Sequence, residues 1–165
     1  MKYKVFILLC IVVLCSNPMQ VHAAKEFNKA AFYSVMASGE LNKIDHEIEV
    51  VQNTAIAEKQ GYEGALLMRK AGLVPKPKDR LKYFKEGRIK FDGAIMADAD
   101  NGEYHFLRLT IQEHAPNAVK YKGDLEKDKQ FIVQHFKSMP ATVQKAIVEY
   151  SKNSGVLHRE DFNFG

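Results

Sequence analysis

The chain has 165 residues, of which 24 are Lys or Arg and 20 are Asp or Glu; 46% are hydrophobic and only two are cysteine. This length and composition are typical of one globular domain. They exclude an intrinsically disordered chain, a disulfide scaffold and a collagen-like or low-complexity fibre.

Residues 1–23 have the pattern of a cleaved export signal. Lys2 and Lys4 precede an uninterrupted apolar run over residues 5–15, and residues 21–23 end in Ala23, with small side chains where a signal peptidase requires them. The run is too short for a comfortable membrane span. We therefore expect cleavage after Ala23, a periplasmic or secreted protein, and no stable membrane span after cleavage. A retained membrane anchor and a lipoprotein attached through a leader cysteine are the alternatives.

Cleavage would leave residues 24–165 as a single domain without cysteine. That removes disulfides, thiolate metal sites, thiol nucleophiles and thioether-linked haem. The leader also takes two lysines and no acidic residue, which leaves 22 basic against 20 acidic side chains and a net charge of +2. This charge is too small for a general nucleic-acid binder, which needs clustered positive charge, so no nucleic-acid partner is expected.

The mature chain has the apolar spacing of helices throughout. Intervals of three and four residues recur, and no segment alternates with the period of two that a half-buried strand shows. Caps, glycines and prolines predict about seven helices, and the tail from about residue 156 lacks a helical pattern. Gly61 and Gly64 either weaken the third helix or allow close helix contact. The expected helices cover residues 26–37, 41–55, 54–71, 77–98, 103–114, 124–139 and 140–155.

Paired in order, the later helices form three hairpins over residues 38–72, 77–116 and 123–155. Units of roughly 35–40 residues are typical of a short stack of helix pairs of the tetratricopeptide kind. The join over residues 94–101, Ala-Ile-Met-Ala-Asp-Ala-Asp-Asn, resembles the end of a tetratricopeptide unit. The predicted fold class is all-α with helices in antiparallel pairs, as an irregular bundle or as a short tetratricopeptide-like stack.

The sequence lacks the motifs of common metal and catalytic sites. No two histidines lie at i and i+4, so zincin and di-iron patterns are missing. Asp98-x-Asp100-x-Gly102 begins like a calcium loop, but Leu109 stands at the twelfth position, which requires Glu. There is no Gly-rich phosphate loop and no Gly-x-Ser-x-Gly elbow. We expect no metal, no cofactor and no catalytic residue.

Three arginines interrupt the apolar faces of the predicted helices. Arg69, Arg88 and Arg108 lie where core side chains belong, and a buried guanidinium is costly unless carboxylates or carbonyls surround it. Three interpretations stay open. In the first, the aliphatic parts of the arginine side chains pack on the core and the guanidinium groups reach water. In the second, the guanidinium groups join a buried ion network. In the third, they bind the carboxylate or phosphate of a ligand.

Two stripes of polar residues complete the set of candidates. His105, Arg108 and Gln112 recur at i, i+3 and i+7, which lines either a polar groove or the solvent side of their helix. A basic stripe on the fourth helix is either a solvated face or a contact for acidic polymers, anionic lipid or an acidic protein. The candidate ligand-binding residues are Arg69, Arg88, Arg108, His105, Gln112 and Glu113, and the basic stripe is Lys78, Lys82 and Lys85.

Three runs carry a resemblance to known proteins. Residues 101–116 (Asn-Gly-Glu-Tyr-His-Phe-Leu-Arg-Leu-Thr-Ile-Gln-Glu-His-Ala-Pro), 64–71 (Gly-Ala-Leu-Leu-Met-Arg-Lys-Ala) and 146–152 (Ala-Ile-Val-Glu-Tyr-Ser-Lys) resemble a family of short, secreted bacterial proteins. The resemblance covers most of the mature chain and implies a helical envelope protein. It implies no activity and no catalytic residue.

The leading functional hypothesis is a non-enzymatic protein- or peptide-binding module of the cell envelope, because stacked helix pairs present grooves suited to peptides and helices. One alternative is a small-ligand carrier or enzyme with an Arg-lined anion pocket. It requires five side chains to converge in one concave pocket: Arg69, Arg88, Arg108, His105 and Glu113. The other is an architectural envelope component that uses the basic stripe.

Overall fold

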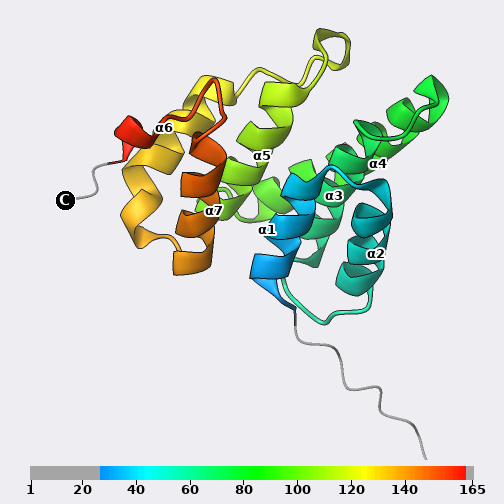
Figure 1. The fold of residues 1–165 in the computed structure, drawn as a ribbon, viewed down its shortest axis with the longest axis horizontal. Helices are drawn as coiled ribbons and strands as arrows, with labels where there is room; N and C mark the ends of the chain where they lie inside the picture. Colours follow the sequence, from blue (N-terminus) through cyan, green and yellow to red (C-terminus); the bar gives the residue numbers. More distant parts are fainter. Residues whose placement is uncertain (1–26, 163–165) are drawn as a thin grey trace, which may run out of the picture.

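The computed structural model describes residues 27–162. The predicted export signal, its cleavage after Ala23 and the last three residues of the predicted tail lie outside the described residues. Over residues 27–162 the fold has seven α-helices and no strand, which confirms the predicted all-α class. In Figure 1, α6 and α7 lie on the left, α2, α3 and α4 on the right, and α1 and α5 between them.

Local capping signals set several helix ends. Asn28 caps α1 by accepting from the backbone N–H of Ala31, and Gly39 ends α1 in the left-handed conformation at φ 67°. Asn101 caps α5 through its side-chain oxygen. The helices are α1 (Lys29–Ser38), α2 (Leu41–Gln52), α3 (Lys59–Ala71), α4 (Pro77–Ala97), α5 (Gly102–His114), α6 (Leu125–His135) and α7 (Ala141–Ser151), with short 3₁₀ helices at Asn117–Val119, Phe136–Ser138 and Arg159–Asp161.

The predicted boundary between the second and third helices is wrong. The apolar spacing suggested a helix through Ala55 and a third helix from Thr54, but α2 ends at Gln52 and α3 begins at Lys59. The hydroxyl of Thr54 donates to the carbonyl of Val50 at 2.7 Å. This bond satisfies one of the last carbonyls of α2 and allows the chain to leave the helix.

The closest helix pair is α3 with α4, across the predicted boundary between two hairpins. Gly64 and Gly87 make this approach possible. A methyl group on Gly64 would lie 2.8 Å from the carbonyl oxygen of Gly87, and one on Gly87 would lie 2.6 Å from that of Gly64. Helix α4 makes little contact with α5, which packs mainly on α6. The first expected hairpin, α2 with α3, is therefore present, whereas the expected pairing of α4 with α5 is replaced by the pairs α3 with α4 and α5 with α6.

Two hydrophobic clusters share helix α5. Tyr104, Leu107 and Ile111 join the cluster built by α1 to α4, whereas Phe106 and Leu109 join the cluster of α6, α7 and the C-terminal segment. A helix that is apolar on most of its circumference is a buried helix. Helix α5 therefore connects the two halves of the domain, and α4 belongs to one half only.

Candidate functional site

Helix α4 carries the large apolar side chains that are well exposed in the described part of the chain. These are Leu81, Ile89 and Met96, with exposed fractions of 49%, 76% and 85%. Spacings of eight and seven residues place them on one side of the helix, away from buried Phe84 and Phe91. We refer to Leu81, Ile89 and Met96 as the α4 ridge.

A hollow lies on each flank of the C-terminal half of the α4 ridge. On one flank, α4 and the start of α3 border an open groove of about 810 Å³. Its lining combines apolar side chains with three carboxylates: Ile89, Ala94, Ala97, Tyr104, Glu58, Glu86 and Asp98.

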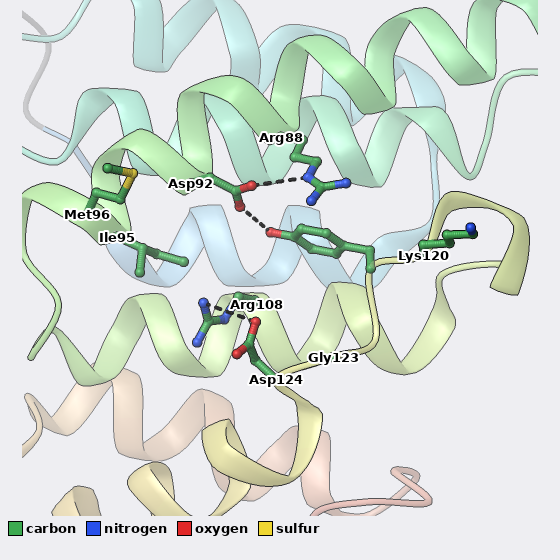
Figure 2. Close-up of a pocket in the computed structure, with 9 residues that line it drawn as sticks. Arg88, Asp92, Ile95, Met96, Arg108, Lys120, Gly123 and Asp124 are labelled. Atoms are coloured by element: carbon green, nitrogen blue, oxygen red, sulfur yellow. Dashed lines mark hydrogen bonds and ion pairs between the residues drawn. The ribbon is translucent and has the colours of Figure 1, made fainter.

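On the other flank, a pocket of about 230 Å³ separates α4 from α5 and from the connector between α5 and α6. We refer to it as the arginine pocket. Figure 2 shows Arg88 and Asp92 on α4, on one side of this pocket, and Arg108 and Asp124 on the other. Its other lining residues are Ile95, Met96, Lys120, Tyr121 and Gly123.

Tyr121 and Asp92 hold the α4 wall of the arginine pocket. The Tyr121 hydroxyl donates to Asp92 Oδ1 at 2.8 Å, and the Arg88 guanidinium lies 5.0 Å from the centroid of the Tyr121 ring. Arg88 Nε donates to Asp92 Oδ2 at 3.1 Å. Burial, followed by the hydrogen bond and charge of Asp92, raises the pKa of Tyr121 far above its ordinary value. The phenol therefore remains a donor at any physiological pH, and both oxygens of Asp92 are used.

Arg108 forms the opposite wall and is anchored by Asp128, which is fully buried. Arg108 Nε donates to Asp128 Oδ2 at 2.7 Å, and its Nη2 donates to Oδ1 at 2.5 Å. His105 Nδ1 lies 2.7 Å from Asp128 Oδ1, and its Nε2 lies 2.9 Å from the carbonyl of Ala99. The stripe of His105 and Arg108 thus faces α6 rather than solvent. Of the three interpretations of the arginines, a buried ion network describes Arg108.

Part of the donor capacity of the arginine pocket is unused within residues 27–162. The carboxylate nearest to Arg108 Nη1 is that of Asp124, at 3.7 Å, which is beyond hydrogen-bond distance. Arg88 uses Nε, and its terminal nitrogens make no hydrogen bond to a described residue. The Arg88 side chain is 45% exposed, so its head reaches water as the first interpretation expected. Lys120 takes a left-handed conformation at φ 48°, and its side chain points away from the other lining residues in Figure 2.

Arg69 and Gln112 do not line the arginine pocket. Arg69 Nε donates to the carbonyl of Met36 at 3.0 Å, so a backbone carbonyl is its partner. Gln112 is buried, and neither its Oε1 nor its Nε2 has a hydrogen-bond partner among the described residues. Both residues remain predictions as ligand contacts.

Glu113 also lies outside the arginine pocket. Its carboxylate accepts from the hydroxyls of Tyr150 at 2.6 Å and Ser154 at 2.7 Å, and from the backbone N–H of Gly155 at 2.6 Å. Burial alone would raise the pKa of Glu113, but these three hydrogen bonds outweigh burial and lower it. Glu113 therefore fastens the segment after α7 to α5. The six candidate residues do not share one pocket; Arg88 and Arg108 do.

The basic stripe is exposed on the N-terminal half of α4, beside the first residue of the α4 ridge. None of Lys78, Lys82 and Lys85 forms an ion pair with another described residue, and Lys82 Nζ lies 5.7 Å from the centroid of the Tyr83 ring. The two interpretations of this stripe stay open.

Two buried carboxylates, Glu103 and Asp128, were not among the residues predicted from the sequence. Glu103 accepts from Lys29 Nζ at 2.7 Å, Tyr33 at 2.7 Å and Tyr62 at 3.0 Å, which ties α1 and α3 to the start of α5. Asp128 is the other. The sequence pattern could have identified Asp128, because this residue interrupts the apolar spacing that contains Ile132, just as Arg108 interrupts the apolar face of α5.

No group of three or more His, Cys, Asp or Glu side chains within residues 27–162 is placed to hold a metal ion. Among the described helices, none has the length and apolar character needed to cross a bilayer. The chain matches no family model, no curated protein and no solved structure. The features of the described residues that point to a function are the α4 ridge and its two flanking hollows.

Proposed function

We propose that the protein is a non-enzymatic protein- or peptide-binding module of the cell envelope and that α4 is its binding surface. The supporting observation is the gathering of Leu81, Ile89 and Met96 on one exposed side of a single helix. Single exposed apolar side chains are ordinary, but three of them on one side of a helix, two of which line hollows, mark a candidate interaction site. Covering such side chains gains about 25 cal/mol per Å² of apolar surface removed from water.

The dimensions of α4 suit an elongated partner. Its 21 residues span about 30 Å at a rise of about 1.5 Å per residue, which matches a helix or an extended segment of a partner. Ile89 lines the groove on one flank and Met96 lines the arginine pocket on the other. A partner that crosses the α4 ridge therefore reaches both hollows.

Helix α4 is closely packed on α3, which favours binding on its outer side. The crossing at Gly64 and Gly87 brings the backbones of α3 and α4 together, and Phe84 and Phe91 are buried below. A surface that is already ordered loses little conformational freedom when a partner binds.

One observation favours a second candidate function. Arg88 and Arg108 share a pocket, as a small-ligand carrier with an anion site requires. The other four predicted ligand residues lie elsewhere, so this candidate rests on two arginines.

Loss of binding to anionic envelope material on neutralising Lys78, Lys82 and Lys85 would instead support the architectural alternative.

A peptide-display selection on residues 24–165 tests the proposed surface. Selected peptides should bind the unmodified protein and should bind an Ile89→Asp, Met96→Asp variant at least about tenfold more weakly, since each carboxylate would have to be desolvated. Gln134→Asp, which adds a carboxylate on the exposed side of α6, is the matched control and should bind normally. Peptides that bind the α4 variant as well as the control would refute the proposal.

A further inference from the structure

We propose that the arginine pocket binds the C-terminal carboxylate of a peptide whose last side chain is apolar. This inference rests on the proposed function, because it places the end of the bound peptide beside the α4 ridge. It commits to one chemistry, a carboxylate joined to an apolar group.

The unused donors of the pocket are cationic nitrogens. Arg108 is fixed through Nε and Nη2 by Asp128, so its remaining terminal nitrogen, Nη1, is held in place at the pocket. Arg88 is fixed through Nε by Asp92, which leaves two terminal nitrogens. Planar guanidinium groups with fixed orientation bind carboxylates well, because little side-chain freedom is lost on binding. The fixed guanidinium of Arg108 on one wall and the partly exposed guanidinium of Arg88 on the other therefore favour a carboxylate over a neutral group.

The carboxylates of the pocket differ in how strongly they compete with a ligand. Asp92 gives one oxygen to Arg88 and the other to Tyr121. Asp124 lies 3.7 Å from Arg108 Nη1 and its side chain is 50% exposed, so it is held loosely. A ligand carboxylate can take the position at Nη1 while Asp124 turns toward water. Asp124 is therefore the intramolecular competitor for the site.

The size and the apolar wall of the pocket select the rest of the ligand. Its volume of about 230 Å³ is below the roughly 300–1,000 Å³ of pockets for drug-sized ligands, so it suits a terminal residue rather than a cofactor. Ile95 is half-buried and Met96 is 85% exposed, which offers apolar contact for one side chain. Because Met96 belongs to both the pocket and the α4 ridge, a chain ending in the pocket continues over the ridge.

The test uses two peptides that differ only at the last group. One is N-acetyl-Gly-Ser-Ala-Leu-Leu with a free C-terminus, and the other is the same peptide with a C-terminal amide. Nitrogen-15 NMR of residues 24–165 follows the Nε–H signals of Arg88 and Arg108 during titration. The free acid should shift both signals, and the amide should shift neither. A third probe, N-acetyl-leucine, supplies the same carboxylate and side chain without a peptide chain.

Three variants place the effect in the pocket. Arg88→Gln should weaken binding of the free acid about tenfold, because it removes charged donors from one wall. Asp124→Asn should strengthen binding a few-fold by removing the competitor. Arg80→Gln, the same substitution on the same helix outside the pocket, should leave the affinity unchanged.

The outcomes separate the inference from the proposed function. If the acid and the amide bind equally and both bindings are lost in the Ile89→Asp, Met96→Asp variant, the ridge is a peptide site and the carboxylate inference is wrong. If N-acetyl-leucine binds as tightly as the pentapeptide, the carboxylate site stands and a peptide as its source is refuted. If no probe shifts Arg88 or Arg108, the inference is overturned.

Discussion

Replacing Gly64 by Ala should strongly destabilise the protein, because two helix backbones meet at this residue. The added Cβ would lie 2.7 Å from the backbone nitrogen of Phe91 and 2.8 Å from both the carbonyl oxygen of Gly87 and Cβ of Phe91. Real Cβ atoms essentially never approach this closely. Two of the three atoms belong to the backbone of α4, so the conflict cannot be relieved by a side-chain rotation and α4 must move.

The expected size follows from two opposing effects. Overpacking of a well-packed site costs about 1–3 kcal/mol, and the upper end applies when backbone must move. Ala is better than Gly in a helix by about 1 kcal/mol, which offsets part of this cost. We expect a net loss of about 2 kcal/mol in the free energy of unfolding, and a fall in melting temperature of about 4–8 °C for a chain of this length.

Gly93 provides the matched control, because it lies in α4 and a Cβ there would meet nothing within 4 Å. Gly93→Ala should gain about 1 kcal/mol from helix propensity alone. Both variants are compared with the unmodified protein by urea unfolding, followed by far-ultraviolet circular dichroism. A Gly64→Ala protein as stable as Gly93→Ala would refute the helix crossing at Gly64 and Gly87.

Four further predictions concern buried polar groups. Asp128→Asn should cost about 3 kcal/mol in urea unfolding, since it leaves the guanidinium of Arg108 without its buried carboxylate partner. Asp124→Asn should change stability by less than about 0.5 kcal/mol. Gln112→Met should raise the melting temperature, because it removes a buried amide that has no partner among the described residues; an unchanged or lower value would mean the amide is satisfied. Because folding lowers the pKa of Glu113, the ionised carboxylate stabilises the protein above about pH 4.3, and this stabilisation is lost as the pH falls through the folded pKa. In the Glu113→Gln variant, the urea concentration at the unfolding midpoint should therefore depend less on pH between about pH 5 and 3 than in the unmodified protein. Burial and then Glu103 raise the pKa of Tyr62 far above 10, so the free energy of unfolding should fall above about pH 10. The ultraviolet absorbance of the Tyr62 phenolate should rise only as the helical circular dichroism signal is lost. Ionisation of all tyrosines before that loss would contradict this prediction.

Features set by neighbours along the chain were predictable from the sequence. The fifth helix was expected over residues 103–114 and runs over Gly102–His114, because the Asn101 cap and Pro116 are local signals. The ion pair of Arg88 with Asp92 spans one helical turn, so it follows from their spacing of four residues along a predicted helix. Residues 98–101 form the turn between α4 and α5 for the same local reason.

Features that depend on contacts between distant segments could be predicted only in part from the sequence. Arg108 stood out as a charge on an apolar face, but its partner Asp128 lies 20 residues away on another helix. Each residue alone is an anomaly in its seam, and only the packing of α5 on α6 shows that one anomaly neutralises the other. Gly64 was open to two interpretations, and its partner Gly87 had no signal of its own. The arginine pocket needs both kinds of information, since Arg88 comes from α4 and Tyr121 from a connector with no helical pattern.

The position of the arginine pocket suggests that some of its residues can contact a ligand while contributing little to the free energy of unfolding. Helix α4 is held by α3 through the glycine crossing and makes little contact with α5, so the pocket lies where the two hydrophobic clusters diverge. Arg88, on one wall of the pocket, is partly exposed. Asp128, which pairs with Arg108 on the other wall, is fully buried. Substitution of Arg88 should therefore change ligand affinity with little effect on unfolding, whereas substitution of Asp128 should change unfolding first. If both variants lost stability equally, the pocket would belong to the core rather than to a binding surface.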